Sequence, residues 1–167
     1  MSQEKTTQED EDLELHDYLE DENKVYLKTH EEINKDLTGE IVVLEEGYVE
    51  LRLTTITEMV ADSLGLIHGG FIFSAADYAA MAAVNEKNVV LVASDCQFLS
   101  PVKIHDEVNF VARVRQKDGR KRNVHVEAFV HDIKVFEGEF KTVITERHIL
   151  KLKLVDEEGE DGEVSEE

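Results

Sequence analysis

Apolar and polar residues alternate with a period of two through most of the second half of the chain. In the third of four such stretches, Val124, Val126 and Ala128 alternate with His125 and Glu127. This period is typical of strands with one buried face. The four predicted strands are Val89 to Leu99, Val108 to Gln116, Val124 to His131, and Val135 to Thr145. No helical pattern separates them, so the sheet is expected to be largely antiparallel.

Two further strands are predicted upstream, where IVVLEEGYVELRL alternates and turns at Glu46-Gly47. Before this hairpin, from Leu13 to about Lys35, apolar residues recur loosely at helical spacing. This earlier pattern predicts one N-terminal helix or a broken pair of helices.

Between the hairpin and the last four strands, the run FIFSAADYAAMAAVN is apolar almost all the way round and rich in alanine. A helix with this composition belongs in an interior, and its small side chains let strands approach closely. The pattern therefore predicts an α+β fold in which a sheet packs against one buried central helix.

The charge of the chain is concentrated at its ends. Of the net −20, residues 1–38 carry 13 acidic and 4 basic side chains, and residues 156–167 carry 8 acidic and none basic. Such segments are usually solvated. We therefore expect an acidic disordered tail at 1–12, a helical segment at 13–38, one folded domain at 39–150 and an acidic tail at 151–167.

Composition also limits the cellular compartment and the classes of binding partner that are expected. Cys96 is the only cysteine, so no internal disulfide forms, and no leader-like or membrane-spanning apolar stretch is present. These features predict a cytoplasmic, soluble protein without a membrane partner. The acidic flanks would repel phosphates, so no nucleic-acid partner is expected.

The candidate chemistry lies at the start of the central helix. Gly69 and Gly70 stand directly before that helix, where backbone N–H groups lack intrahelical partners and the helix dipole is positive. Asp77 follows Gly70 by about two turns and shares its face. A carboxylate in an apolar helix must be hydrogen-bonded, lie at an interface, or work as an acid or base. A bond to Ser74 or to a neighbouring backbone group remains the structural alternative.

The run HGGFIFSAAD, set between a strand pair and a four-strand block, resembles the HGG-type hotdog thioesterases, including the phenylacetyl-CoA thioesterase group. The resemblance covers about residues 39–146 and implies a hotdog fold that acts on acyl-CoA. It implies that the Gly70 amide polarises the thioester carbonyl, that Asp77 activates water or attacks directly, and that His68 orients the thioester. It also implies a homodimer or a dimer of dimers with the site at a subunit interface, and no cofactor besides the CoA thioester.

Two other segments are candidates for substrate binding. A basic turn that contains Asp118-Gly119 is suited to the phosphates of CoA, or is an ordinary polar hairpin turn. Its cations are Lys117, Arg120, Lys121 and Arg122. The strand end with Phe98, Pro101 and Val102 resembles the pantetheine channel of the family, or is core strand and turn. Gly69 and Ser74 complete the expected substrate-binding set.

Alternative functions remain open at this stage. Leu37 to Asp77 also resembles the effector domain of the FapR-type lipid repressors, which bind malonyl-CoA without depending on hydrolysis; a non-catalytic acyl-CoA-binding regulator is therefore the second hypothesis. Hotdog dehydratases are a third, although the proline-glycine entry to their helix is missing.

No metal is expected, because the remaining histidines show no metal-ligand spacing and are interpreted as surface or strand residues. These are His16, His30, His105, His125, His131 and His148.

Overall fold

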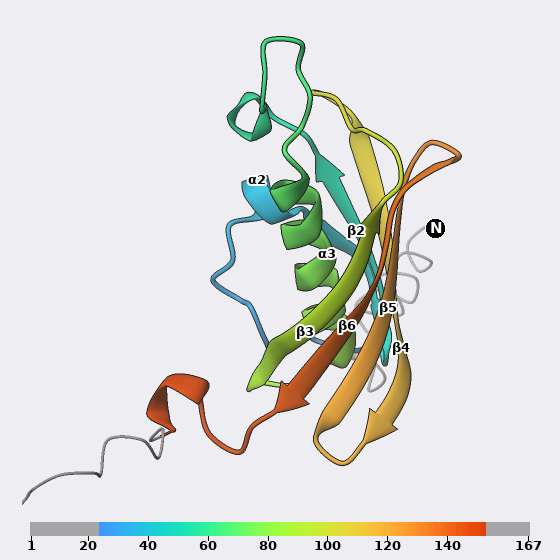
Figure 1. Cartoon of the computed structure of the whole chain (residues 1–167). Coiled ribbons are helices and arrows are strands. Elements are labelled where there is room, and N and C mark those ends of the chain that lie inside the picture. The colour runs from blue at the N-terminus through green and yellow to red at the C-terminus, as the bar shows by residue number, and fades with distance from the viewer. Residues whose placement is uncertain (1–23, 153–167) are drawn as a thin grey trace, which may run out of the picture.

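A single antiparallel sheet of six strands forms the body of the protein. The computed structural model describes residues 24–152 and is shown in Figure 1. The strands are β1 (Glu40–Glu45), β2 (Tyr48–Thr54), β3 (Val89–Phe98), β4 (Glu107–Asp118), β5 (Lys121–Val130) and β6 (Ile133–Ile144). Their order in the sheet is β1-β2-β4-β5-β6-β3, and every neighbouring pair is antiparallel. The predicted antiparallel sheet is confirmed.

One long helix, α3 (Gly69–Val84), lies against one face of the sheet, which curls around it (Figure 1). Its alanines are almost entirely buried, because their small side chains let the helix sit close to β2, β4 and β5. The helix begins at Gly69, so the two glycines form its first two residues rather than preceding it. The predicted α+β hotdog architecture with a central buried helix is confirmed.

The strands place alternate residues on the two faces of the sheet. Val124, Val126 and Ala128 are fully buried toward α3, and the residues between them point to the opposite side, called here the outer face. His125 departs from this pattern, because it lies on the outer face yet is only 6% exposed. The interpretation of this histidine as an ordinary surface or strand residue therefore misses its burial.

Within residues 24–38, the part of the N-terminal segment that the structure describes, only the last four residues are helical. A short helix, α2 (Lys35–Thr38), precedes the sheet, but residues 24–34 form no helix, so the predicted extent of the N-terminal helix is wrong there. Instead, the side chain of Asn85, which ends α3 in a left-handed conformation, accepts a bond from the Lys28 N–H (2.8 Å) and donates to the Tyr26 carbonyl (2.7 Å). These bonds tie the non-helical segment to the end of α3. The predicted tails and residues 13–23 lie outside the described residues, apart from 151–152.

Two short 3-10 helices complete the structure, η1 (Thr57–Met59) before the loop that enters α3 and η2 (Ile149–Lys151) after β6. None of the helices within residues 24–152 combines the length and hydrophobicity that a bilayer crossing requires.

Candidate active site at the start of the central helix

The first turn of α3 presents two free backbone donors. His68 is the N-cap residue, and its carbonyl accepts a bond from the Phe71 N–H at 3.1 Å. Within residues 24–152, neither the Gly69 N–H nor the Gly70 N–H has a hydrogen-bond acceptor. Both donors sit at the positive end of the helix dipole, where an oxygen with developing negative charge is stabilised.

At both glycines a side chain would crowd a neighbouring ring. A Cβ atom on Gly69 would lie 3.1 Å from Cε1 of Phe98, and a Cβ atom on Gly70 would lie 2.9 Å from Nε2 of His68. Without these Cβ atoms, the Phe98 and His68 rings pack over the helix entrance. The Phe98 ring thus lies close to Gly69, and the His68 ring lies close to Gly70.

A cavity of about 310 Å³ opens beside Gly69. Apolar side chains make up most of its wall, and Phe98 and Leu99 at its margin are 56% and 45% exposed. Four of the residues that the sequence assigned to substrate binding meet here: Gly69, Phe98, Pro101 and Val102. The structure thus brings the helix entrance and the end of β3 together around one hollow, and a substrate-binding role for these residues stays a prediction.

Asp77 is the one acidic residue of α3. Its Oδ1 atom is buried and has no hydrogen-bond partner, and among the described residues no bond to Ser74 is formed. Burial raises the pKa of the Asp77 carboxyl from 3.8 to about 6. The structural alternative, an aspartate held by Ser74 or the local backbone, is therefore absent from residues 24–152.

Asp77 and Gly70 share a helix face but are separated along it. Seven residues of α-helix rise about 10 Å, which is too far for both groups of one chain to contact one carbonyl. The two groups of one chain therefore lie about two turns apart along α3.

Comparison with known proteins identifies the family. The sequence profile of the thioesterase superfamily matches residues 64–137, a span that contains the glycine pair and Asp77. The structure is similar to that of an uncharacterized protein, PH1136, from Pyrococcus horikoshii, with 41% identity, a TM-score of 0.74, and coverage of 75% of this chain and 97% of that one. The chain belongs to the thioesterase superfamily.

Other solved structures share the fold at lower identity. The E. coli PaaI protein from the phenylacetic acid degradation operon is 25% identical, with a TM-score of 0.62 and coverage of 66% of this chain and 82% of that one. A hypothetical thioesterase of Streptococcus pneumoniae, solved with coenzyme A, is 18% identical, with a TM-score of 0.60 and coverage of 65% and 87%. At that identity, the second likeness shows the fold alone.

Curated relatives are longer than this chain. A methylthioribose-1-phosphate isomerase of Aquifex aeolicus is 54% identical over 117 residues, which are 70% of this chain and 26% of that protein. The transcription factor FapR of Thermoanaerobacter is 28% identical over 127 residues, which are 75% of this chain and 64% of that protein. The chain thus spans about a quarter of the first relative and less than two thirds of the second.

The basic turn of this thioesterase-superfamily chain lies away from the glycine pair. The turn between β4 and β5 lies toward the C-terminal end of α3, opposite the end where the helix begins (Figure 1). Arg120 pairs with Glu146 (2.6 Å) and Lys117 with Glu46 (3.7 Å), both in exposed positions. Lys121 and Arg122 line a second hollow of about 310 Å³ together with Lys141 of β6. Sequence reasoning missed Lys141, because only the register of β5 and β6 reveals its position.

The raised pKa of Asp77 predicts a pH-dependent stability. The folded state keeps the proton between pH 3.8 and about 6, so this contribution to stability is full below pH 3.8 and is lost as the pH rises through about 6. The shift corresponds to about 3 kcal/mol. Urea unfolding of the wild type and of Asp77→Asn at pH 4 to 7.5 should show the wild type losing stability relative to the variant by up to that amount. A difference that stays constant with pH would contradict the shift.

Proposed function

We propose that this chain hydrolyses acyl-CoA thioesters to the free acid and CoA. The observation that carries the proposal is the Asp77 carboxylate, buried on one side, without a partner for Oδ1, and with its pKa raised to about 6. Such a group is mostly ionised at neutral pH and still basic enough to take a proton from water. The free N–H groups of Gly69 and Gly70 are suited to stabilising the negative oxygen of the intermediate. Membership of the thioesterase superfamily supports the reaction type.

In the proposed reaction, water attacks the carbonyl carbon while Asp77 removes its proton. The Gly70 N–H donates to the carbonyl oxygen as that oxygen becomes negative, and His68 orients the thioester. Collapse of the tetrahedral intermediate breaks the C–S bond and releases CoA, whose thiolate recovers a proton. Asp77 could act as a nucleophile in the same position. Its carboxylate would then attack the carbonyl carbon and displace CoA, and water would hydrolyse the resulting anhydride in a second step.

A homodimer, alone or within a dimer of dimers, would join the two halves of the site. Within the described chain, β3 is the last strand of the sheet, pairs only with β6, and leaves a ten-residue edge open. Antiparallel pairing of two β3 edges around a two-fold axis would place Phe98 beside the first residues of the partner's strand. Gly70 of one subunit would thereby approach Asp77 of the partner subunit.

Two features support CoA as the carrier of the acyl group. The apolar cavity beside Gly69 suits a pantetheine arm, and the basic hollow with Lys121, Arg122 and Lys141 suits phosphates. In one chain, the cavity beside Gly69 lies at the start of α3, and the basic hollow lies toward the other end of that helix. In an antiparallel dimer, the cavity of one subunit would therefore lie near the basic hollow of the partner subunit. The coenzyme A in the fold-level neighbour from Streptococcus pneumoniae agrees with this assignment.

A non-catalytic acyl-CoA-binding regulator is the second candidate, and the similarity to FapR favours it. Residues 1–38 carry 13 acidic and 4 basic side chains, which disfavours direct DNA binding by that segment. A regulator of this kind would need a protein partner, and its acyl-CoA pocket would bind ligand without turnover.

One panel separates the two candidates. Purified chain is mixed with short, medium, long and aromatic acyl-CoAs, free thiol is followed with a chromogenic reagent, and binding is measured by calorimetry. The enzyme proposal expects catalytic thiol release from at least one acyl class. Saturable binding of acyl-CoA with no thiol release in any class would instead support the regulator.

A further inference from the structure

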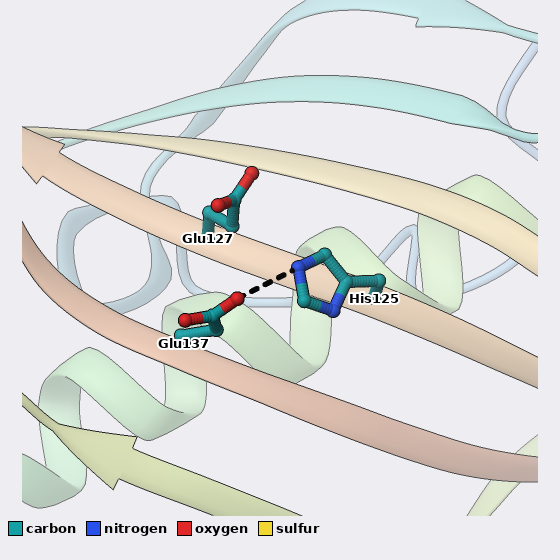
Figure 2. A group of neighbouring side chains, drawn as sticks. All are labelled: His125, Glu127 and Glu137. Atoms are coloured by element: carbon teal, nitrogen blue, oxygen red, sulfur yellow. Dashed lines mark ion pairs between the residues drawn. The ribbon is translucent and has the colours of Figure 1, made fainter.

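A second group of polar side chains lies on the outer face of the sheet, away from α3. Figure 2 shows His125 and Glu127 of β5 facing Glu137 of β6. One ligand atom from each of these residues lies within 4.8 Å of the other two. Nε2 of His125 is 3.2 Å from Oε1 of Glu137, and the histidine side chain is only 8% exposed. This cluster belongs to neither the helix entrance nor the basic hollow.

Strand pairing places like charges directly against each other in this cluster. In the register of β5 and β6, Glu127 is opposite Glu137, and His125 is opposite Glu139. Two carboxylates in directly opposed positions destabilise a sheet unless a cation lies between them. In the structure the ammonium of Lys134 supplies this charge, with Nζ within 3.4 Å of a carboxylate oxygen of each glutamate.

The hydrogen bonding of His125 leaves one ring nitrogen available to a cation. Its Nδ1 atom lies 2.5 Å from Oε1 of Glu139. A neutral imidazole has one N–H, and when this N–H is donated to Glu139 the Nε2 lone pair faces the Glu137 carboxylate. Two acceptors 3.2 Å apart repel unless a proton or a metal joins them. A carboxylate that orients a histidine whose other nitrogen is free is the arrangement found behind metal-bound histidines.

We propose that His125, Glu127 and Glu137 form a zinc site, with Glu139 holding the histidine and water as the fourth ligand. Imidazole and carboxylate donors suit Zn²⁺, and ligand atoms at about 2.1 Å in a tetrahedron are about 3.4 Å apart. The pair formed by His125 and Glu137 already has about this spacing, and the ligand atoms of the three residues all lie within 4.8 Å of one another. Changes in the glutamate rotamers would bring the more distant ligand atoms to the spacing of about 3.4 Å that a tetrahedral site requires. The bound ion would clamp β5 to β6.

One cation of the chain, Lys134, pairs with both proposed glutamate ligands, and a second, Arg115, pairs with the supporting Glu139. Nζ of Lys134 lies 2.5 Å from Oε1 of Glu127 and 3.4 Å from Oε2 of Glu137, and Arg115 is 3.6 Å from Glu139. Lys134 is one-third exposed and sits on a flexible side chain, so it can swing into solvent when the metal enters. Zinc therefore replaces the lysine ammonium, and removing that ammonium strengthens binding.

Calorimetric titration of the full chain with ZnCl₂ tests the site. The expected result is one saturable site per chain that Glu127→Gln and Glu137→Gln each weaken at least tenfold. Glu139→Gln weakens it about 10- to 100-fold, because it acts through the orientation of His125. Lys134→Ala tightens binding several-fold. Glu107→Gln, on β4 and paired only with Arg52, is the matched carboxylate control and leaves the affinity unchanged.

Circular dichroism and thermal unfolding distinguish loss of the site from misfolding of a variant, and from zinc bound by the acidic ends of the chain. Circular dichroism confirms the fold of each variant, and zinc should raise the melting temperature of the wild type but not of Glu127→Gln. Zinc binding that is equal in the wild type and both glutamine variants, or the absence of a stoichiometric site, would overturn the proposal. Unchanged or weaker binding by Lys134→Ala would do so as well.

Discussion

Asp77→Asn should lower kcat for acyl-CoA hydrolysis by about 10²- to 10⁴-fold, the range typical of a lost general base. The asparagine keeps the shape of the side chain but does not accept a proton from water. Binding of acyl-CoA should stay within a few-fold of the wild type, because the cavity beside Gly69 does not include residue 77. Thiol release under saturating substrate, together with calorimetric binding, measures both effects.

The matched control is Asp132→Asn, in the exposed turn between β5 and β6. It removes the same charge from the same residue type, far along the chain from α3, and should leave kcat unchanged. In the wild type, kcat should rise with pH as the Asp77 carboxyl ionises near pH 6, and this limb should disappear with the variant. Hydrolysis by Asp77→Asn at the wild-type rate would remove Asp77 from the mechanism.

Local pattern was enough to predict most of the fold. The alternation around Val124 and Val126 follows from burial of one sheet face, and the alanine-rich run follows from burial of a whole helix. The period of two fixes which residues face the core. It does not fix which strands become neighbours, and the strand order places β3 beside β6 at the edge.

The features that sequence reasoning missed all depend on strand register or on long-range contacts. Glu127 meets Glu137 only because β5 and β6 pair in one register, with an irregularity between Ala128 and Phe129. Tyr26 lies outside any helix, and its carbonyl accepts a bond from a side chain 59 residues away at the end of α3. Local apolar spacing favours a helix in that segment, and this distant partner outweighs it.

The candidate site was found by a different route from the fold. Helix physics identifies free amides at Gly69 and Gly70, but an aspartate in an apolar helix is equally compatible with a structural bond. The resemblance to HGG-type hotdog enzymes favoured a catalytic role for Asp77. The structure adds that its Oδ1 atom is buried without a partner, and that the glycine pair and Asp77 are separated by about 10 Å of helix.

Gly70→Pro tests the other half of the site, because proline deletes the one backbone N–H that is proposed to stabilise the oxyanion. Proline is tolerated in the first turn of a helix, where no intrahelical acceptor is available. The expected loss in kcat is about 10²- to 10³-fold. Gly70→Ala is the control for crowding, since it keeps the N–H but displaces the His68 ring, whose Nε2 would lie 2.9 Å from the new Cβ. The loss that belongs to the N–H is the difference in kcat between the two variants. An equal loss in both variants would assign the effect to crowding.

Mixing the two inactive variants then decides whether the site spans two subunits. In the proposed homodimer, co-refolded Asp77→Asn and Gly70→Pro chains would form mixed dimers in which one site joins an intact Gly70 to an intact Asp77 of the partner subunit. Half of randomly assembled dimers are mixed and each holds one such site, so about a quarter of the wild-type activity should return. If both groups act within one chain, neither site of a mixed dimer is complete and no activity returns. The helix geometry, with about 10 Å between the two residues, predicts the first outcome.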